Sequence, residues 1–220
     1  MSKVIFSKAQ KLERNLFYLF RNEEYLAINK PVGIECIAGK EPGKQLIALM
    51  ASMELIKAGN SIPVPINSLA NDVSGVVLMS RNASAGKLAR GILKTGQEFW
   101  PCKYWGLLSG KVPFRHTNGV INYPLLNGQP NSEGVVAITN WKLLKYANHI
   151  PLKETSLIEF EPRTNIPNQI SIQAGHTLKM IPHMLHLHQM EASLPNGEHV
   201  SIVAPPRDDF LKFINDLGWK

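Results

Sequence analysis

The sequence predicts an α+β fold, in which a mixed, largely antiparallel central sheet is flanked by helices. Apolar runs of strand length outnumber the windows that show helical periodicity. These runs do not alternate strictly with helices, as the strands of a doubly wound parallel sheet do. The 220 residues, 44% of them apolar, are enough for one domain with a sizeable core. We therefore expect a single domain organised around one sheet.

The first half of the chain is expected to contain two strands and two helices. The strands are 25–28 and 76–79, each a short apolar run beside turn-forming residues. The helices are 46–56 and 85–93, in which apolar residues recur at three- and four-residue spacing. The expected apolar side of the second helix carries Leu88, Ile92 and Leu93.

The second half is expected to consist mostly of strands, before a last amphipathic helix that starts at Asp208. The predicted strands are 103–109, 135–144, 156–161, 170–172, 185–188 and 200–203. His186 and His188 lie two apart on a strand and so share one face. No third ligand is placed near them, so we expect no metal site.

Composition and charge limit the class of protein. The two cysteines form no CxxC pair, which favours a reducing, intracellular compartment. No run approaches the ~20 apolar residues of a membrane helix, so no membrane partner is expected. The formal charge of +7 favours a polyanionic partner, with nucleic acid first. Residues 1–20 form a basic N-terminal arm that is either a weak mitochondrial presequence or a basic first helix.

Four segments carry a distinctive pattern, in chain order. They are Tyr-Leu-Ala-Ile-Asn-Lys-Pro-Val-Gly at 25–33, Asn-Ser-Leu-Ala-Asn-Asp-Val-Ser-Gly at 67–75, Cys-Lys-Tyr-Trp-Gly-Leu-Leu-Ser-Gly at 102–110, and Thr-Asn-Ile-Pro-Asn-Gln-Ile-Ser-Ile-Gln at 164–173. Together they resemble the motifs of RluA-type pseudouridine synthases, which isomerise uridine in RNA. The resemblance covers about residues 19–218. It implies that residues 21–220 form that family's catalytic domain, with no S4-type RNA-binding domain before it.

The resemblance also implies which chemical groups have been replaced. The family's reactive aspartate falls at Ala70, and the arginine that keeps it ionised falls at Ser171. Loss of both is physically consistent, because losing only the aspartate would leave an uncompensated buried cation. The family's His-Arg pair, which helps to extrude the nucleotide, falls at Asn67 and Ser68. We therefore predict no catalytic residue, and a vestigial pocket formed by Asn67, Ser68, Leu69, Tyr104, Asn168 and Gln169.

One acidic residue could replace the missing aspartate. Asp72 lies two positions after Ala70, which is about 6–7 Å along an extended chain. A misplacement of ~1 Å can already reduce a rate by on the order of a hundredfold. Asp72 is therefore the fallback acid in an alternative prediction, in which the chain is an active enzyme.

Basic and aromatic residues near these motifs are candidates for RNA contacts. Because neighbouring residues of a strand point to opposite faces, only one of Tyr104 and Trp105 can face the pocket, and we expect Tyr104 to do so. The candidate phosphate contacts are Lys30, Lys87, Arg90, Lys94 and Lys103.

The sequence thus predicts a catalytically inactive pseudouridine synthase homologue that binds structured RNA. The expected target is rRNA, and the expected role is a structural component or assembly factor of a ribosome or other ribonucleoprotein. Two alternatives stay open: an active RNA pseudouridine synthase that uses Asp72, and a protein-interaction scaffold without RNA contact. We expect no cofactor. Mitochondrial localisation is favoured over cytoplasmic.

Overall fold

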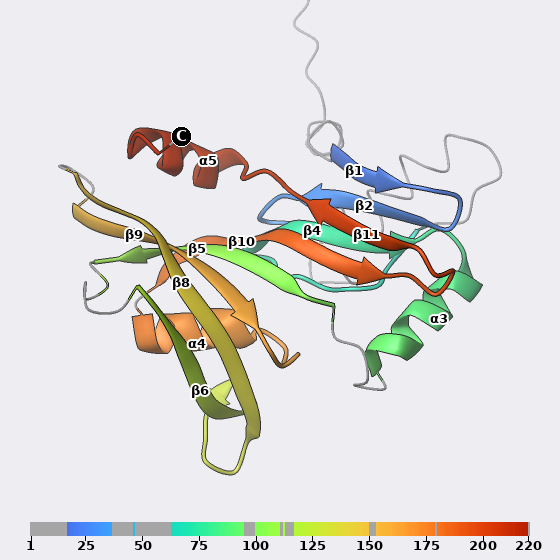
Figure 1. Cartoon of the computed structure of the whole chain (residues 1–220), viewed down its shortest axis with the longest axis horizontal. Helices are drawn as coiled ribbons and strands as arrows, with labels where there is room; N and C mark the ends of the chain where they lie inside the picture. Colours follow the sequence, from blue (N-terminus) through green and yellow to red (C-terminus); the bar gives the residue numbers. More distant parts are fainter. Residues whose placement is uncertain are drawn as a thin grey trace, which may run out of the picture.

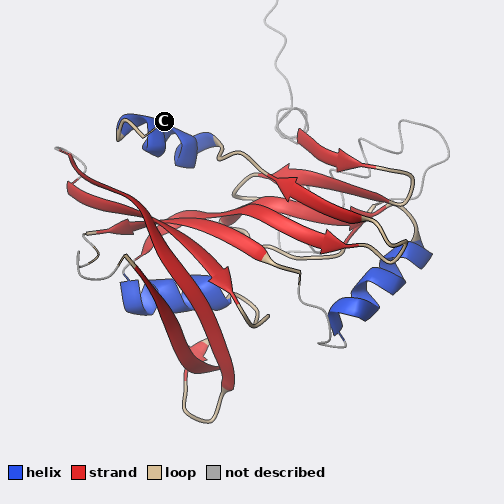
Figure 2. Ribbon diagram, in the orientation of Figure 1, coloured by secondary structure: helices blue, strands red, loops and turns tan. Residues whose placement is uncertain are grey.

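The computed structural model describes residues 17–36, 46, 63–94, 100–110, 112, 117–149, 153–178 and 180–219. In these ranges the chain forms one eleven-stranded sheet with three helices beside it (Figures 1 and 2). The strands are β1 (Phe17–Arg21), β2 (Tyr25–Lys30), β3 (Val64–Pro65), β4 (Val73–Ser80), β5 (Cys102–Ser109), β6 (Asn118–Leu126), β7 (Gln129–Pro130), β8 (Val135–His149), β9 (Lys153–Pro162), β10 (Met180–Ser193) and β11 (His199–Val203). The helices are α3 (Ala83–Lys94), α4 (Gln169–Leu178) and α5 (Asp208–Asp216).

The strand order is β1-β2-β4-β10-β5-β9-β8-β6-β7, with β11 paired to β10 and β3 paired to β4. Among the described strands the pairing of β4 with β10 is parallel and every other pairing is antiparallel. The expected mixed, largely antiparallel α+β fold is confirmed. At the parallel pairing Gly75 lies opposite Leu187 with φ +118°, a backbone conformation that side chains other than glycine's rarely adopt.

The buried apolar residues of the described part of the chain form two clusters. The larger cluster includes the fully buried strands β2 and β4, and α4 joins it through Ile170 and Ala174. The smaller one lies beneath α5 and includes Leu107 of β5 and Phe210 of the helix. Figure 1 shows α4 and α5 on opposite sides of the central strands.

Most of the predicted strands exist, with bounds extended by a few residues. The exception is 170–172, which is not a strand but the first turn of α4. The alternation of Ile170, Ser171 and Ile172 suggested a strand. In the structure Ile170 and Ala174, four residues apart, are both buried, which is helical spacing. Gln169 and Gln173 repeat that spacing on the buried side.

Three further expectations need correction or lie wholly or partly outside the described residues. Leu88 is not on the buried side of α3: it is 60% exposed, and the small residues Ala85 and Ala89 pack against the sheet instead. The predicted helix at 46–56 lies outside the described residues, except for the buried Leu46. Of the basic arm only residues 17–20 are described, and these belong to β1.

Candidate functional site

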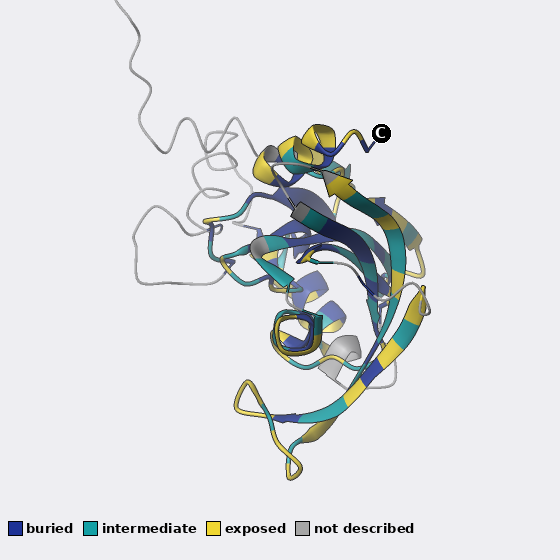
Figure 3. Cartoon of the chain, turned by 90° about the vertical axis from the view of Figure 1, so that its left-hand side faces the viewer, coloured by how far each residue is buried: buried dark blue, intermediate teal, exposed yellow. Residues whose placement is uncertain are grey.

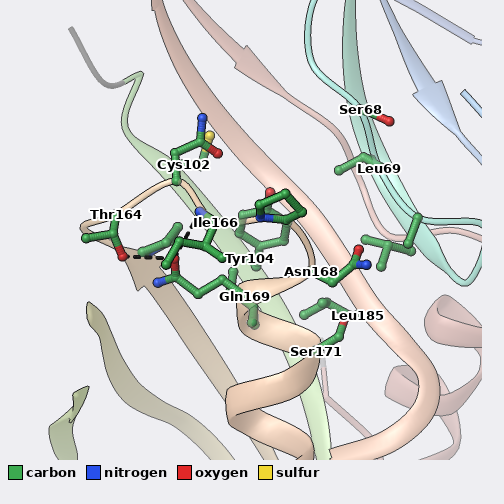
Figure 4. A pocket seen from close by; sticks show the side chains of 16 residues that line it. Ser68, Leu69, Cys102, Tyr104, Thr164, Ile166, Asn168, Gln169, Ser171 and Leu185 are labelled. Atoms are coloured by element: carbon green, nitrogen blue, oxygen red, sulfur yellow. Dashed lines mark hydrogen bonds between the residues drawn. The ribbon is translucent and has the colours of Figure 1, made fainter. Parts of the chain in front are cut away.

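A cavity of about 130 Å³ opens between the 66–72 loop, β5 and the segment that leads into α4. The segments come from distant parts of the sequence, and the large sheet brings them together (Figure 4). The loop contributes Ser68, Leu69 and Ala70, and β5 contributes Cys102 and Tyr104. The residues from the α4 side are Pro162, Thr164, Asn165, Ile166, Pro167, Asn168, Gln169, Ile170 and Ser171.

The 66–72 loop is held by its own backbone and by buried polar groups of the neighbouring segment. Gly33 N–H donates to Asn71 O at 2.8 Å, and Leu69 N–H donates to Cys36 Sγ at 3.3 Å. The Asn67 side chain bonds the backbone of β4, with its Nδ2 donating to Val76 O and its Oδ1 accepting from Leu78 N–H. Asn67 therefore attaches the loop to β4 and does not line the cavity, contrary to the sequence prediction.

Lys30 was expected to contact RNA at the surface, but in the structure it is buried. Its side chain is fully buried, and Nζ donates to the carbonyl oxygens of Pro31 (3.1 Å), Ile34 (2.9 Å) and Ala70 (3.2 Å). Burial lowers the pKa of Lys30 to about 8, although the nearby Cys36 and Asp72 act in the opposite direction. The ammonium group thus ties the loop that carries Ala70 to the end of β2.

The other wall of the cavity is the N-terminal end of α4. Asn168 precedes the helix with φ +57°, a left-handed conformation that asparagine tolerates better than most residues. The Gln169 amide is fully engaged: its Nε2 donates to Ile138 O and Thr139 Oγ1, and its Oε1 accepts from the Thr164 hydroxyl at 2.8 Å. Gln169 therefore fixes the wall and has little capacity left for a ligand.

Tyr104 lines the cavity and Trp105 does not. Trp105 lies on the opposite face, where it stacks on His188 with the ring centroids 3.8 Å apart. Burial raises the pKa of the Tyr104 hydroxyl far above its ordinary value and raises that of the Cys102 thiol to about 12. Both groups are protonated at neutral pH.

Ala70 and Ser171 both line this cavity. The two positions that the family resemblance assigned to an ion pair therefore share one site, although they lie far apart in the sequence. Among the described residues that line the cavity, none carries a formal charge. Asp72 is half-buried and does not contribute to the lining, and its carboxylate acts on Lys30.

Two solved structures of human proteins share this architecture. RNA Pseudouridylate Synthase Domain Containing 4 superposes with a TM-score of 0.71 at 19% sequence identity, over 96% of this chain and 95% of that one. RNA Pseudouridylate Synthase Domain Containing 1 gives 0.69 at 14% identity, over 94% and 96% of the two chains. The chain has a pseudouridine synthase fold. No protein-family model matches the sequence, and a search of curated proteins finds no match either.

On this pseudouridine synthase fold, those predicted RNA contacts whose side chains the structure describes do not form one surface. Lys103 precedes Tyr104 on β5, so it points to the face away from the cavity. On that face lies His188, whose pKa is lowered mainly by burial and to a smaller extent by the charge of Lys103. On α3, Lys87 is exposed, while Arg90 is half-buried and donates to Pro65 O at 3.4 Å. The side chain of Lys94 lies outside the described part of the structure.

Sequence reasoning missed two polar networks that stabilise the pseudouridine synthase fold. Thr139 donates to the Gln173 side chain, and Gln173 Nε2 donates to Ala137 O, which joins β8 to α4. The buried Ser74 hydroxyl lies 2.8 Å from His186 Nδ1, and burial lowers the pKa of His186 to about 4. Glutamines spaced by four in a predominantly apolar run were the available signal for the first network.

Neither a metal site nor a membrane span is found in the described residues. Among them, no group of three or more His, Cys, Asp or Glu side chains could hold a metal ion. None of the helices that the structure describes is both long and apolar enough to cross a membrane.

Proposed function

We propose that the chain is a catalytically inactive pseudouridine synthase homologue that binds structured RNA. The proposed target is rRNA, and the proposed role is a component or assembly factor of a ribosome or another ribonucleoprotein. The observation that carries the proposal is the uncharged lining of the cavity, which includes Ala70 and Ser171. The family resemblance assigns a reactive ion pair to these two positions. Mitochondrial localisation is part of the proposal and rests on the basic start of the sequence alone.

The chemistry of uridine isomerisation argues that such a cavity does not catalyse this reaction. Breaking the bond between sugar and base requires a nucleophile or general base within reach of it. Tyr104 and Cys102 are the titratable side chains in the lining, and their raised pKa values keep both protonated at neutral pH. Ser68, Thr164 and Ser171 carry hydroxyls, but a hydroxyl needs an adjacent base to become a nucleophile.

The alternative of an active enzyme depends on Asp72. Its carboxylate does not line the cavity, and it interacts electrostatically with the buried ammonium group of Lys30. For this carboxylate to reach a substrate in the cavity, the loop that carries Asp72 would have to rotate. The contacts of Gly33, Lys30 and Asn67 oppose such a movement.

RNA binding is supported by the fold and by the net charge of +7. Basic and acidic residues balance within the described ranges, so the basic excess belongs to residues outside them. Residues 1–16 hold much of it, with Lys3, Lys8, Lys11 and Arg14 against Glu13. We propose that these residues supply phosphate contacts and that the folded domain recognises RNA by shape.

The test is to map pseudouridine in the RNA that co-purifies with the protein, for wild type, Asp72→Ala and Ala70→Ser. We expect the same map from all three, because none of these side chains acts in catalysis. A uridine that is converted by wild type and Ala70→Ser but not by Asp72→Ala would establish the active-enzyme alternative and end this proposal.

RNA binding itself is tested separately by measuring affinity against salt concentration. Phosphate contacts make log affinity fall linearly with log salt, with a slope proportional to the number of contacts. We expect such a slope for structured rRNA fragments. Affinity that does not change with salt, or no RNA in the purified complex, would favour the protein-interaction scaffold.

A further inference from the structure

The edge of the sheet at β6 is open over residues 118–123, six of the nine residues of the strand. On one side β6 pairs with β8, from Asn118 opposite Lys142 to Leu125 opposite Val135. On the other side it pairs only with β7, at Leu125 and Leu126. Among the described strands, none pairs with residues 118–123 on that side. An unpaired strand edge is a template for another strand.

The alternation of hydrogen bonds identifies the free backbone groups. Leu143 N–H donates to Thr117 O at 2.7 Å, which places the bonds of residues 117, 119 and 121 on the β8 side. Asn131 N–H donates to Pro124 O at 3.0 Å, which places the even-numbered residues on the outer side. The N–H and C=O groups of Asn118, Val120 and Asn122 therefore point away from the sheet.

On one face of this open window the residue types are symmetric about Val120. Asn118 and Asn122 are exposed, and Val120 between them is 61% exposed, one of the most exposed large apolar side chains described. On the α4 side of the strand lie Gly119 and the buried Ile121. The Trp141 ring covers Gly119 so closely that an added Cβ would be 2.8 Å from it. Figure 3 shows the hairpin of β6 and β8 extending away from the body of the domain.

We propose that two copies of the chain associate weakly by pairing their β6 edges antiparallel about a twofold axis at Val120. This register places Val120 opposite Val120 of the second copy and each Asn118 opposite Asn122. On the α4 side it places Ile121 of one copy beside Gly119 and the Trp141 ring of the other. The pairing does not depend on RNA binding or on catalytic inactivity.

The open window itself favours a second copy over another partner. It is bounded by Pro124 and β7, so it admits about five residues, and the pattern Asn-x-Val-x-Asn matches itself when reversed. Such a short ladder buries less than the ~1,000 Å² of a stable interface. The dimer is therefore expected to dissociate on dilution.

The first test is sedimentation equilibrium of the full chain, without RNA, from about 5 to about 200 μM. We expect the average mass to rise above 24.5 kDa with concentration. Val120→Asp places two like charges opposite each other and should weaken association by at least ~tenfold. Val135→Asp is the matched control, because Val135 is 66% exposed on the same hairpin but outside the window. It should associate like wild type.

The second test fixes the register. Val120→Cys should form a disulfide-linked dimer under mild oxidation, because opposite residues of paired strands lie within disulfide range. Val135→Cys should not, and the native Cys36 and Cys102 are buried and give little background. A wild-type mass of 24.5 kDa at all concentrations, or equal cross-linking of the two cysteine variants, would overturn the proposal.

Discussion

Replacing Lys30 with methionine tests whether its ammonium group holds the loop at Ala70. The substitution keeps the length of the side chain and removes its donors. The carbonyls of Pro31 and Ile34 lose this partner, whereas Ala70 O keeps the Val73 N–H at 3.1 Å. Two unsatisfied buried acceptors cost about 1–3 kcal/mol each, and the lost bond to Ala70 about 1.5 kcal/mol more.

Relief of the buried charge offsets part of this cost. The pKa of Lys30 falls from 10.5 to about 8 in the fold, which corresponds to roughly 3 kcal/mol of disfavoured ionisation. We therefore expect Lys30→Met to be less stable than wild type by about 2 kcal/mol at pH 7. Lys87→Met, on the exposed side of α3, is the control and should change stability by less than ~0.5 kcal/mol.

The pH dependence gives a sharper criterion. Between about pH 8 and pH 10.5 the unfolded chain binds more protons at Lys30 than the folded chain does. The contribution of Lys30 to the unfolding free energy of wild type therefore rises with pH across this window. The methionine variant lacks this gain, so the gap between the two proteins should widen by up to roughly 3 kcal/mol. Urea unfolding followed by tryptophan fluorescence at pH 7 and 10 measures it. A gap that narrows with pH, or a variant as stable as wild type at pH 7, would refute the assigned role.

Three other predictions concern the cavity, the sheet and the basic arm. Ala70→Asp alone should yield no pseudouridine in a uridine-containing rRNA fragment, because Ser171 supplies no cation, and robust turnover would contradict this. Gly75→Ala should lower the unfolding free energy by more than ~3 kcal/mol in urea, because its Cβ would overlap the backbone of Leu187; a loss under ~1 kcal/mol would show that the strands can separate there. Glutamine at all four basic positions of residues 1–16 should reduce the salt slope of RNA binding by about 2–3, and an unchanged slope would place the phosphate contacts elsewhere.

The sequence was most informative where apolar runs are long. The β2 and β4 strands are buried along their whole length, and continuous apolar residues there left few alternatives. It was least informative at 169–173, where three residues alternate as in a strand. Formation of a helix here depends on Gln169 and Gln173, whose hydrogen-bond partners Thr139 and Ile138 lie on β8. Such partners are not visible in a local pattern.

The candidate site, too, could be predicted from the sequence only in part. Ala70, Tyr104 and Ser171, which come from three of the sequence motifs, line one cavity. The locations of the Lys30 and Lys103 side chains could not be predicted from residue type, because a lysine in a sequence motif is expected to be a surface cation. Burial of one and strand alternation of the other depend on the packed sheet.

The contacts that hold the 66–72 loop do not depend on the side chain at residue 70. The loop is fixed by the backbone at Ala70 and Asn71 and by the side chain of Asn67, and the Ala70 methyl group takes no part in those bonds. A substitution at residue 70 can therefore change the chemistry of the cavity while these backbone contacts stay in place. The reactivity of the pocket and the shape of its wall can change independently, provided that a charge removed at residue 70 is matched by one removed at residue 171.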